Sequence, residues 1–263
     1  MVVGLDYGKL VGESFDYAKE GLTGNFVTWI LLIVLSILPA IPIFIWVLTT
    51  IPLMMGGKPN YSVLIGGFIF AFIIAVILGA FYQGYMLKIL RAEKPLPPVT
   101  DFGILFTDGI KYLIINIVYM IPVILVLLIT AGAAMLAVMP AVMSGNYSSI
   151  MGLALGSVFI GLLVSIILAI ILALFAIIGI VRFARTGTMS EAFNFNAILA
   201  TMRKIGSLGY IIALIILFIL VFIVMIILGI IPYIGGLLQL LISPFIGVFI
   251  MRYICLLYDS AGA

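Results

Sequence analysis

The chain has 263 residues, of which 66% are hydrophobic and only 8% are charged, and its net charge is +3. A water-soluble domain carries about 25% charged residues, and no soluble fold of this size buries so much apolar surface. The composition excludes a soluble enzyme, a nucleic-acid-binding domain and a disordered protein, and it indicates a multi-pass membrane protein.

The first predicted element is an amphipathic helix over residues 5–20. On a helical wheel its charged residues share one side and its apolar residues share the other. The charged side holds Asp6, Lys9, Glu13, Asp16 and Glu20. The apolar side holds Tyr7, Leu10, Val11, Phe15, Ala18 and Leu22. An amphipathic helix that leads into a membrane span is expected to lie at the membrane interface.

Four stretches without Asp, Glu, Lys or Arg predict the membrane spans, and they cover residues 21–57, 59–87, 112–181 and 205–251. A spanning helix needs about 20 apolar residues, so the first two stretches hold one helix each and the last two hold two each. Turn-forming residues divide the long stretches at 140–149 and at 229–236. The six spans are predicted at 25–51, 61–88, 112–138, 150–181, 208–231 and 236–257.

Prolines and short amphipathic segments complete the predicted architecture. Pro39 and Pro42 predict a bend in the first span. Short amphipathic helices are expected before the third and fifth spans, capped by Thr100 and Ser190 respectively. The chain is therefore expected to be an all-α, polytopic membrane bundle of six transmembrane helices in three hairpins, with amphipathic cytoplasmic elbow helices. Similar chemistry in the three hairpins suggests an internal repeat.

The basic residues are distributed very unevenly over the predicted connections. Eleven fall on one side: Lys9, Lys19, Lys88, Arg91, Lys94, Lys111, Arg182, Arg185, Arg203, Lys204 and Arg252. Only Lys58 falls on the other. Since connections rich in Lys and Arg stay in the cytoplasm, both termini are predicted there, in a multi-pass protein of the plasma membrane. The two glycosylation sequons, at Asn60 and Asn146, fall in predicted outer connections, where short polar loops also produce such triplets by chance.

A group of short motifs lies in the middle of the chain. These motifs are Gly84-Tyr85 with Arg91, Pro95-Leu96-Pro97, Asp108-Gly109-x-Lys111 and Tyr119-x-x-Pro122. In these residues the chain resembles a family of prokaryotic, mainly archaeal, multispanning membrane proteins catalogued as domain of unknown function 4013. The match covers about forty residues well and the rest by hydropathy. The resemblance implies the membrane fold and an archaeal source, and it carries no activity or site residues.

The inventory of reactive side chains is small. There is no histidine, and Cys255 is the single cysteine, so the commonest metal ligands are scarce and no cofactor or metal is expected. Asp101 and Asp108 with Lys111 are the best candidates for an enzyme site. Metal-dependent lipid-phosphate chemistry needs a denser acidic cluster, so the chain is not expected to be an enzyme.

Polar residues inside the predicted spans are Tyr82, Gln83, Asn116, Tyr119, Ser157, Ser165, Gln239 and Ser243. None is a carboxylate or an amine, which disfavours ion-coupled transport. Asn116 and Tyr119 share a helix face one turn before Pro122, and with Gln83 they form a candidate polar intramembrane site. The simpler interpretation of an isolated asparagine in a span is an interhelical hydrogen bond.

Small residues recur at intervals of four in two of the spans and predict close helix packing. These candidate stripes are Ala71, Ala75 and Gly79 in the second span, and Gly161, Ser165, Ala169 and Ala173 in the fourth. Basic residues at the inner helix ends are candidate contacts for anionic lipid headgroups. They are Lys88, Arg91, Arg182 and Arg185.

Two functions remain open from these residues. The first is a non-catalytic accessory or scaffold component of a membrane assembly, or a self-associating bundle. The second is a passive channel or an uncoupled carrier for a small solute that uses the region of Asn116. The expected partners are the lipid bilayer and other membrane subunits or copies of the chain, and no nucleic acid.

Overall fold

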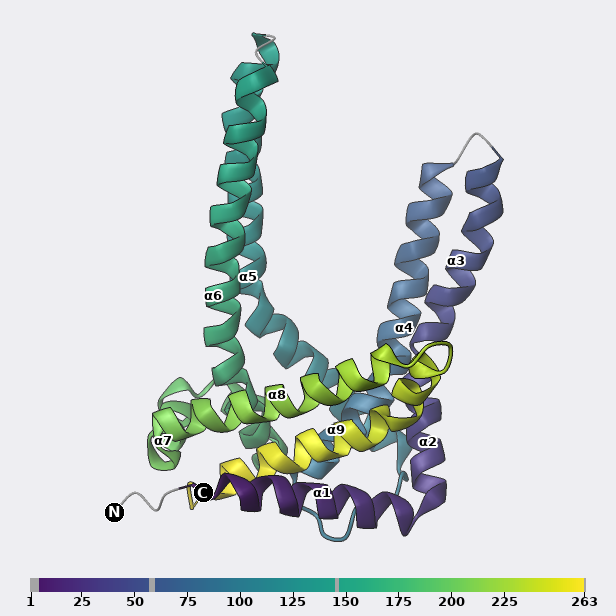
Figure 1. Cartoon of the computed structure of the whole chain (residues 1–263), viewed down its shortest axis with the longest axis vertical. Helices are drawn as coiled ribbons and strands as arrows, with labels where there is room; N and C mark the ends of the chain where they lie inside the picture. The colour runs from purple at the N-terminus through teal and green to yellow at the C-terminus, as the bar shows by residue number, and fades with distance from the viewer. Residues whose placement is uncertain (1–4, 57–59, 145–146, 263) are drawn as a thin grey trace.

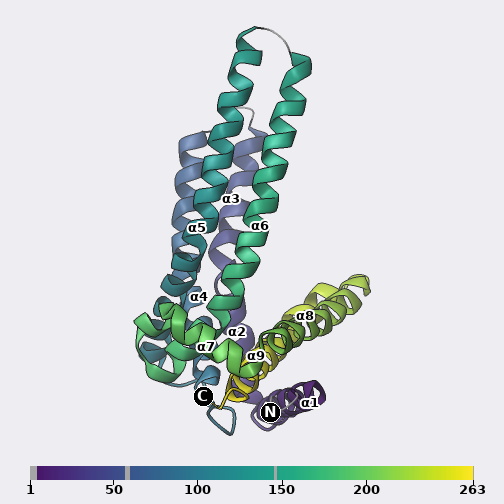
Figure 2. The same cartoon turned by 90° about the vertical axis from the view of Figure 1, so that its left-hand side faces the viewer.

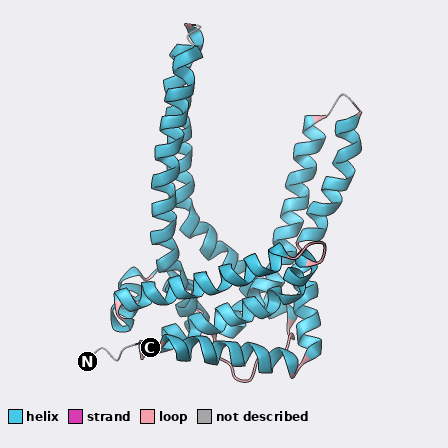
Figure 3. Cartoon of the chain, in the orientation of Figure 1, coloured by secondary structure: helices cyan, strands magenta, loops and turns pink. Residues whose placement is uncertain are grey.

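The computed structural model describes residues 5–56, 60–144 and 147–262. Over these residues the regular structure is helical, and Figure 3 shows helices joined by short loops. The elements are α1 (Tyr7–Thr23), α2 (Phe26–Ile37), α3 (Ala40–Met55), α4 (Tyr61–Leu90), α5 (Phe102–Met143), α6 (Tyr147–Thr186), the 3-10 helix η1 (Met189–Phe193), α7 (Phe195–Ile205), α8 (Ser207–Ile230) and α9 (Gly235–Asp259). Lys58 and Asn146 lie outside the described residues.

Six helical segments in the described part of the chain are long and apolar enough to cross a membrane, which confirms the predicted number. They are Phe26–Met55, Tyr61–Leu90, Phe102–Pro140, Val158–Thr186, Ser207–Ile230 and Gly235–Asp259. Their most apolar windows have mean hydropathies between 2.2 and 3.8. These lengths and compositions are those of a multi-pass membrane protein.

The first span is bent, as its prolines predict. Helix α2 ends at Ile37 and α3 begins at Ala40, with Leu38 and Pro39 between them. Proline has no amide hydrogen, so Pro39 and Pro42 cannot donate to the carbonyl groups one turn earlier. The helix axis therefore changes direction at this point (Figure 1).

The segment before the third span differs from its prediction. Residues 102–111 do not form a separate helix, because α5 continues without a break from Phe102 to Met143. No proline interrupts the helix before Pro122, and Figure 1 shows α5 as a single bent helix. The residue that caps α5 is Asp101, in the left-handed conformation with φ of 58°, and not Thr100. The Thr100 hydroxyl instead donates to the Asp101 carboxylate over 3.1 Å.

The segment before the fifth span forms two short elements instead of one helix. Residues Met189–Phe193 form η1, and α7 begins only at Phe195. The cap of α7 is Asn194, whose side chain accepts a hydrogen bond from the backbone of Ala197 over 3.2 Å. The predicted cap, Ser190, lies within η1. An asparagine whose side chain accepts a hydrogen bond from the backbone N–H three residues later is a strong helix N-cap. The helix therefore starts after Asn194, later than the predicted start after Ser190.

The long helices are arranged in neighbouring pairs. Figures 1 and 2 show α5 beside α6, and α8 beside α9, with the second pair steeply inclined to the first. Helix α3 packs against α4, and the upper parts of this pair and of α5–α6 stand apart in Figure 1. Helix α1 packs along α9 through Leu10, Ser14, Ala18 and Leu22.

Most of the buried residues gather at one end of the molecule. This region contains residues 85–90 at the end of α4, 178–184 near the end of α6, and 253–258 near the end of α9. We call it the base. Among its side chains Tyr85, Phe183 and Tyr253 are almost completely buried. The base therefore joins three helix ends that are far apart in the sequence, and it holds the inclined pairs together.

Helices α4 and α5 cross at the base with their backbones in close contact. A Cβ atom on Gly84 would overlap the backbone of Leu105, and a Cβ atom on Gly109 would overlap the backbone of Ala80. Ala80 and Gly84 lie one turn apart on α4, and Leu105 and Gly109 lie one turn apart on α5. Small residues at this spacing allow two helices to approach closely in a membrane protein.

Candidate functional site

Three ion pairs connect helix ends at the base, and each uses an arginine of the predicted headgroup contacts. Arg91 pairs with Asp108 of α5, Arg182 pairs with Glu191 of η1, and Arg185 lies 2.7 Å from Asp259 of α9. The fourth predicted contact, Lys88, donates to the Pro98 carbonyl over 3.4 Å. These basic groups therefore serve contacts within the chain, and their contact with lipid stays a prediction.

The pair between Arg182 and Glu191 also affects the ionisation of the carboxylate. The guanidinium of Arg182 and the amide of Asn194 both donate to Glu191 and lower its pKa below the usual value. The carboxylate consequently stays charged to a lower pH than an ordinary glutamate does, and the pair links η1 to the end of α6. Because the folded state lowers this pKa, the pair stabilises the fold at neutral pH and is lost as the pH falls below the usual range of glutamate.

Tyrosine hydroxyl groups form a second set of links between segments. The Tyr119 hydroxyl donates to the Ala192 carbonyl over 2.6 Å, and the Tyr210 hydroxyl donates to the Leu174 carbonyl over 2.7 Å. Tyr253 donates to the Ala213 carbonyl over 2.9 Å. Each bond satisfies a buried hydroxyl and a backbone acceptor on a different element, so these tyrosines join elements and are not open to a ligand.

The proline-rich connection between α4 and α5 is held on two sides. The Tyr85 hydroxyl donates to the Pro97 carbonyl over 2.8 Å, and Tyr17 of α1 donates to the Glu93 carbonyl over 2.9 Å. Burial raises the pKa of Tyr17 to about 12, so its hydroxyl stays protonated and remains a donor. Leu96 lies against Gly21 of α1, where any Cβ would meet the leucine side chain. The motif residues therefore build the base.

The structure does not bring the predicted polar intramembrane residues into one site. The Asn116 amide donates over 2.9 Å to the carbonyl of Tyr112 in its own helix, one turn earlier. Tyr119 is buried, and its hydroxyl is used by Ala192. Gln83 instead lines a separate pocket, which neither Asn116 nor Tyr119 lines.

This polar pocket, of about 540 Å³, lies among α2, α3, α4, α8 and α9. Its polar side chains are Ser36, Tyr82, Gln83, Gln239 and Ser243. Most of these are polar residues inside the predicted spans, but they lie on helices from distant parts of the sequence. Spacing along one helix pointed to Asn116 and Tyr119, whereas the packing of α4 against α9 determines which polar residues meet.

The small-residue stripes pack mainly within their own helix pairs. On α6, Gly161 lies against Thr130 of α5 and Ser165 is buried, whereas Ala169 is half-buried and Ala173 is exposed. On α4, Ala71 is buried, Ala75 is half-buried and Gly79 lies next to Pro39. Most of each stripe is therefore used inside the molecule.

The candidate enzyme residues are not gathered into a shared site. Asp108 is buried in its pair with Arg91, and Asp101 caps α5. No hydrogen bond or ion pair between Lys111 and either carboxylate occurs among the described residues. The Asp108 carboxylate thus has a structural role, whereas the Asp101 carboxylate makes no capping hydrogen bond to α5 and accepts one from the Thr100 hydroxyl.

These features define a helical membrane protein whose base is held by buried glycines, ion pairs and tyrosine links. A family described as "Protein of unknown function (DUF4013)" matches residues 67–233, which is more than half of the chain. The chain belongs to this family, as its motif residues suggest. The matched region runs from within α4 to the end of α8 and contains the α4–α5 crossing. No curated protein and no solved structure matches the chain significantly.

Proposed function

We propose that the protein is a non-catalytic scaffold or accessory component of a membrane assembly, which acts through contacts of its helices in the bilayer. In this proposal the six spans form three hairpins, and the base and both termini face the cytoplasm of the cell that carries the protein. The excess of basic residues on the base side supports that orientation. The first turns of α5, and η1 with α7 before the fifth span, then lie at the inner interface.

The observation that carries the proposal is a set of open glycines on the two projecting helix pairs. Apart from the adjacent backbone of the same helix, no described atom lies within 4 Å of where a Cβ would stand on Gly66 of α4, Gly132 of α5 or Gly156 of α6. A glycine in a lipid-facing helix lowers helix propensity, and its benefit is to let another helix backbone approach closely. These positions are therefore suited to contact with further membrane helices.

The low burial of the projecting spans supports the same proposal. Only 11% of the residues in the most apolar windows of Phe26–Met55 and Tyr61–Leu90 are buried, compared with 44% for Gly235–Asp259. The side chains of Phe159 and Ile160 on α6 are 63% and 64% exposed. Packing contributes much of helix association in a bilayer, and these pairs have most of their surface free for it.

Replacing Gly132 or Gly156 by leucine tests this proposal. Each substitution adds a side chain to open space, so the monomer is expected to fold and to gain about 1 kcal/mol of helix propensity. The added bulk is expected to block the approach of a partner helix. The variant is therefore expected to lose its contacts with other membrane proteins, or with further copies of the chain, in its native membranes. Chemical cross-linking in those membranes followed by mass spectrometry measures both outcomes.

Gly103→Leu is the matched control, because Gly103 also has open space around it but lies near the start of α5, away from the projecting pairs. This variant is expected to keep the same cross-linked species as the unsubstituted chain. A chain that runs as a monomer in its native membranes, with no cross-linked partner, contradicts the scaffold proposal.

A passive channel or uncoupled carrier is the second candidate, and the polar pocket around Gln83 favours it. The pocket places Gln83 of α4 beside Gln239 and Ser243 of α9, and amide and hydroxyl groups can replace the water around a small polar solute. The Gln239 amide nitrogen donates to the Met225 carbonyl over 3.1 Å, and its amide oxygen is a further group that can accept from a solute. This candidate requires the pocket to open to both sides of the membrane.

Solute leakage from reconstituted vesicles tests this second candidate. If the pocket conducts, the unsubstituted chain is expected to release a small neutral polyol faster than protein-free vesicles, and Gln83→Leu with Gln239→Leu is expected to remove most of that release. The control is Ser14→Ala, which changes a buried hydroxyl on α1 outside this pocket. Release equal to that of protein-free vesicles contradicts the carrier.

A further inference from the structure

A charged pocket of about 500 Å³ lies between α1 and the proline-rich connection that follows α4. It is lined by Glu13, Asp16, Tyr17, Glu20, Lys94, Pro95 and Arg252. Helix α1 and Arg252 fall outside the part of the chain that matches the family. The pocket is also separate from the ion pairs of the base, because none of the residues in those pairs lines it.

Arg252 is the unusual residue of this pocket. It is 2% exposed, and its guanidinium lies 4.7 Å from the centre of the Tyr17 ring. Its Nε–H group is buried and meets no acceptor among the described residues. Its Nη1 group donates to the Cys255 sulfur over 3.9 Å, and sulfur is a weak acceptor.

The contrast with the three arginines of the ion pairs shows what Arg252 lacks. Arg91, Arg182 and Arg185 each have a carboxylate partner, whereas no carboxylate lies within 4 Å of Arg252 in the described part of the chain. A buried guanidinium without a counter-ion is costly, because desolvation of the charge is not offset by an ion pair. Arg252 is thus positioned to receive an anionic group from outside the chain.

The remaining charges narrow the type of ligand. Lys94 adds a second positive charge to the pocket, and Glu13, Asp16 and Glu20 add three negative ones. Of these acids, Glu13 lies 3.7 Å from Lys9 in an exposed ion pair. A simple anion is attracted by Arg252 and Lys94 but repelled by the three carboxylates. A simple cation is attracted by the carboxylates but repelled by Arg252 and Lys94. A ligand that carries both charges satisfies both groups.

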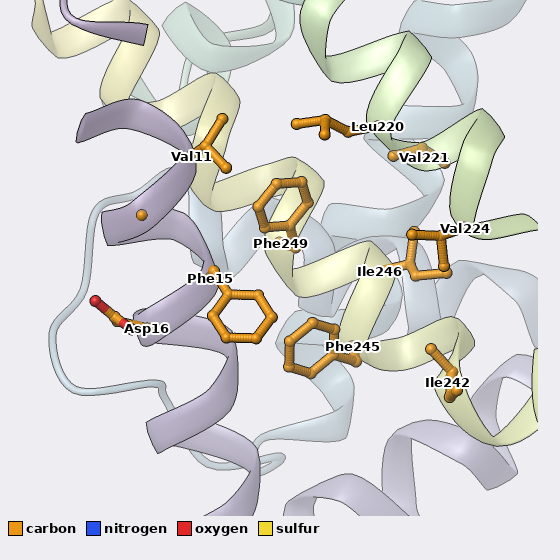
Figure 4. Close-up of a pocket in the computed structure, with 11 residues that line it drawn as sticks. Val11, Phe15, Asp16, Leu220, Val221, Val224, Ile242, Phe245, Ile246 and Phe249 are labelled. Carbon is orange, nitrogen blue, oxygen red and sulfur yellow. The ribbon is translucent and has the colours of Figure 1, made fainter. Parts of the chain in front are cut away.

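An apolar groove lies on the other flank of α1, beside the charged pocket. The groove has a volume of about 460 Å³, and Figure 4 shows Phe15, Phe245 and Phe249 gathered in it while Asp16 is directed to the opposite side of the helix. The rings of Phe15 and Phe245 lie 5.5 Å apart. Asp16 lines both the groove and the charged pocket, so an apolar surface begins where the charged pocket ends.

We infer that the charged pocket binds the phosphoethanolamine head of a phospholipid, with the phosphate at Arg252 and Lys94 and the ammonium group at Glu13, Asp16 and Glu20. The Tyr17 ring holds the guanidinium in place through a cation–π contact. The acyl chains then extend along the apolar surface of α1. The site is independent of the proposed function, since a scaffold and a carrier can each hold such a lipid.

The test uses the full chain and measures which lipid it retains. Protein in nanodiscs of equal parts phosphatidylethanolamine and phosphatidylglycerol is transferred to detergent, and the retained lipid is counted by native mass spectrometry. We expect phosphatidylethanolamine to be retained preferentially. Lys94→Gln and Glu20→Gln, at two exposed positions, are each expected to reduce this retention about fivefold, as for the loss of one partly screened ionic contact.

Lys204→Gln is the matched control, because Lys204 is an exposed lysine on α7 that does not line the pocket. It is expected to leave retention unchanged. Arg252→Lys keeps the charge but removes the planar fork of N–H donors that can bind a phosphate with two bonds, and it is expected to weaken retention in a chain that still folds.

Three results overturn the inference. Equal retention of the two lipids excludes a site for the ethanolamine head. Retention that falls with Lys94→Gln but not with Glu20→Gln shows a simple anion site. Titration with free phosphoethanolamine distinguishes a phospholipid from a soluble ligand. If free phosphoethanolamine binds but phosphatidylethanolamine is not retained, the pocket is a site for a soluble ligand and not for a lipid.

Discussion

Gly84→Ala and Gly109→Ala are each expected to destabilise the folded chain by about 3 kcal/mol, the upper end of the usual cost of overpacking. At both positions the new methyl group meets the backbone of the opposite helix, and not the end of a flexible side chain. A backbone carbonyl cannot rotate away, so α4 and α5 have to separate. Separation also disturbs the Arg91–Asp108 pair, which joins the same two helices.

The thermal unfolding midpoint in detergent, followed by circular dichroism, measures this effect, and size-exclusion chromatography reports the folded yield. Gly103→Ala is the matched control on α5, since among the described residues no atom beyond its own helix backbone lies within 4 Å of the added methyl group. Its midpoint is expected to stay the same or to rise slightly, because alanine favours the helix over glycine. If Gly84→Ala unfolds at the same temperature as Gly103→Ala, the helices do not cross as closely as described.

The absence of charge predicted the six long apolar helices found in the described part of the chain, because the physical requirement for such a helix is local. A helix in hydrocarbon needs about 20 consecutive apolar residues, and four uncharged stretches with two turn segments are enough to place six helices. The predicted span 61–88 differs from α4 by only two residues at its end. The bend after Ile37 follows from proline chemistry alone.

The partners of the charged helix ends were not predictable from the same pattern. The distribution of basic residues places Arg91 and Arg185 at helix ends, but it does not show that Asp108 and Asp259 lie opposite them. Arg185 and Asp259 are 74 positions apart in the sequence. Such pairs depend on how the helices are inclined, which hydropathy does not determine.

The polar residues of the spans show the same limit more clearly. Asn116 and Tyr119 are neighbours on one helix face, yet their polar groups bond to Tyr112 and Ala192 respectively. Helical spacing finds residues that share a face, but the neighbouring element decides whether that face lines a pocket or is covered. Here η1 covers Tyr119, and its position depends on the pair between Arg182 and Glu191.

Arg91→Met is expected to destabilise the fold by about 2–3 kcal/mol, because it leaves the buried carboxylate of Asp108 without its partner. The Asp108 side chain is 9% exposed, whereas that of Arg91 is 30% exposed. The cost of breaking a fully buried pair is about 3–5 kcal/mol, and the partial exposure of Arg91 reduces it. Chemical unfolding in detergent micelles, followed by tryptophan fluorescence, measures the loss.

The double variant Arg91→Met with Asp108→Leu separates two contributions to the free energy of unfolding. One is the stabilisation by the ion pair, and the other is the cost of leaving a single buried charge without a partner. Replacing both members by apolar side chains removes the unpaired charge, and such replacements are often close to neutral. We therefore expect the double variant to be more stable than Arg91→Met alone, although it lacks the ion pair. If the two losses simply add, Arg91 and Asp108 do not interact, and the α4–α5 crossing is held by the glycine contacts of Gly84 and Gly109 alone.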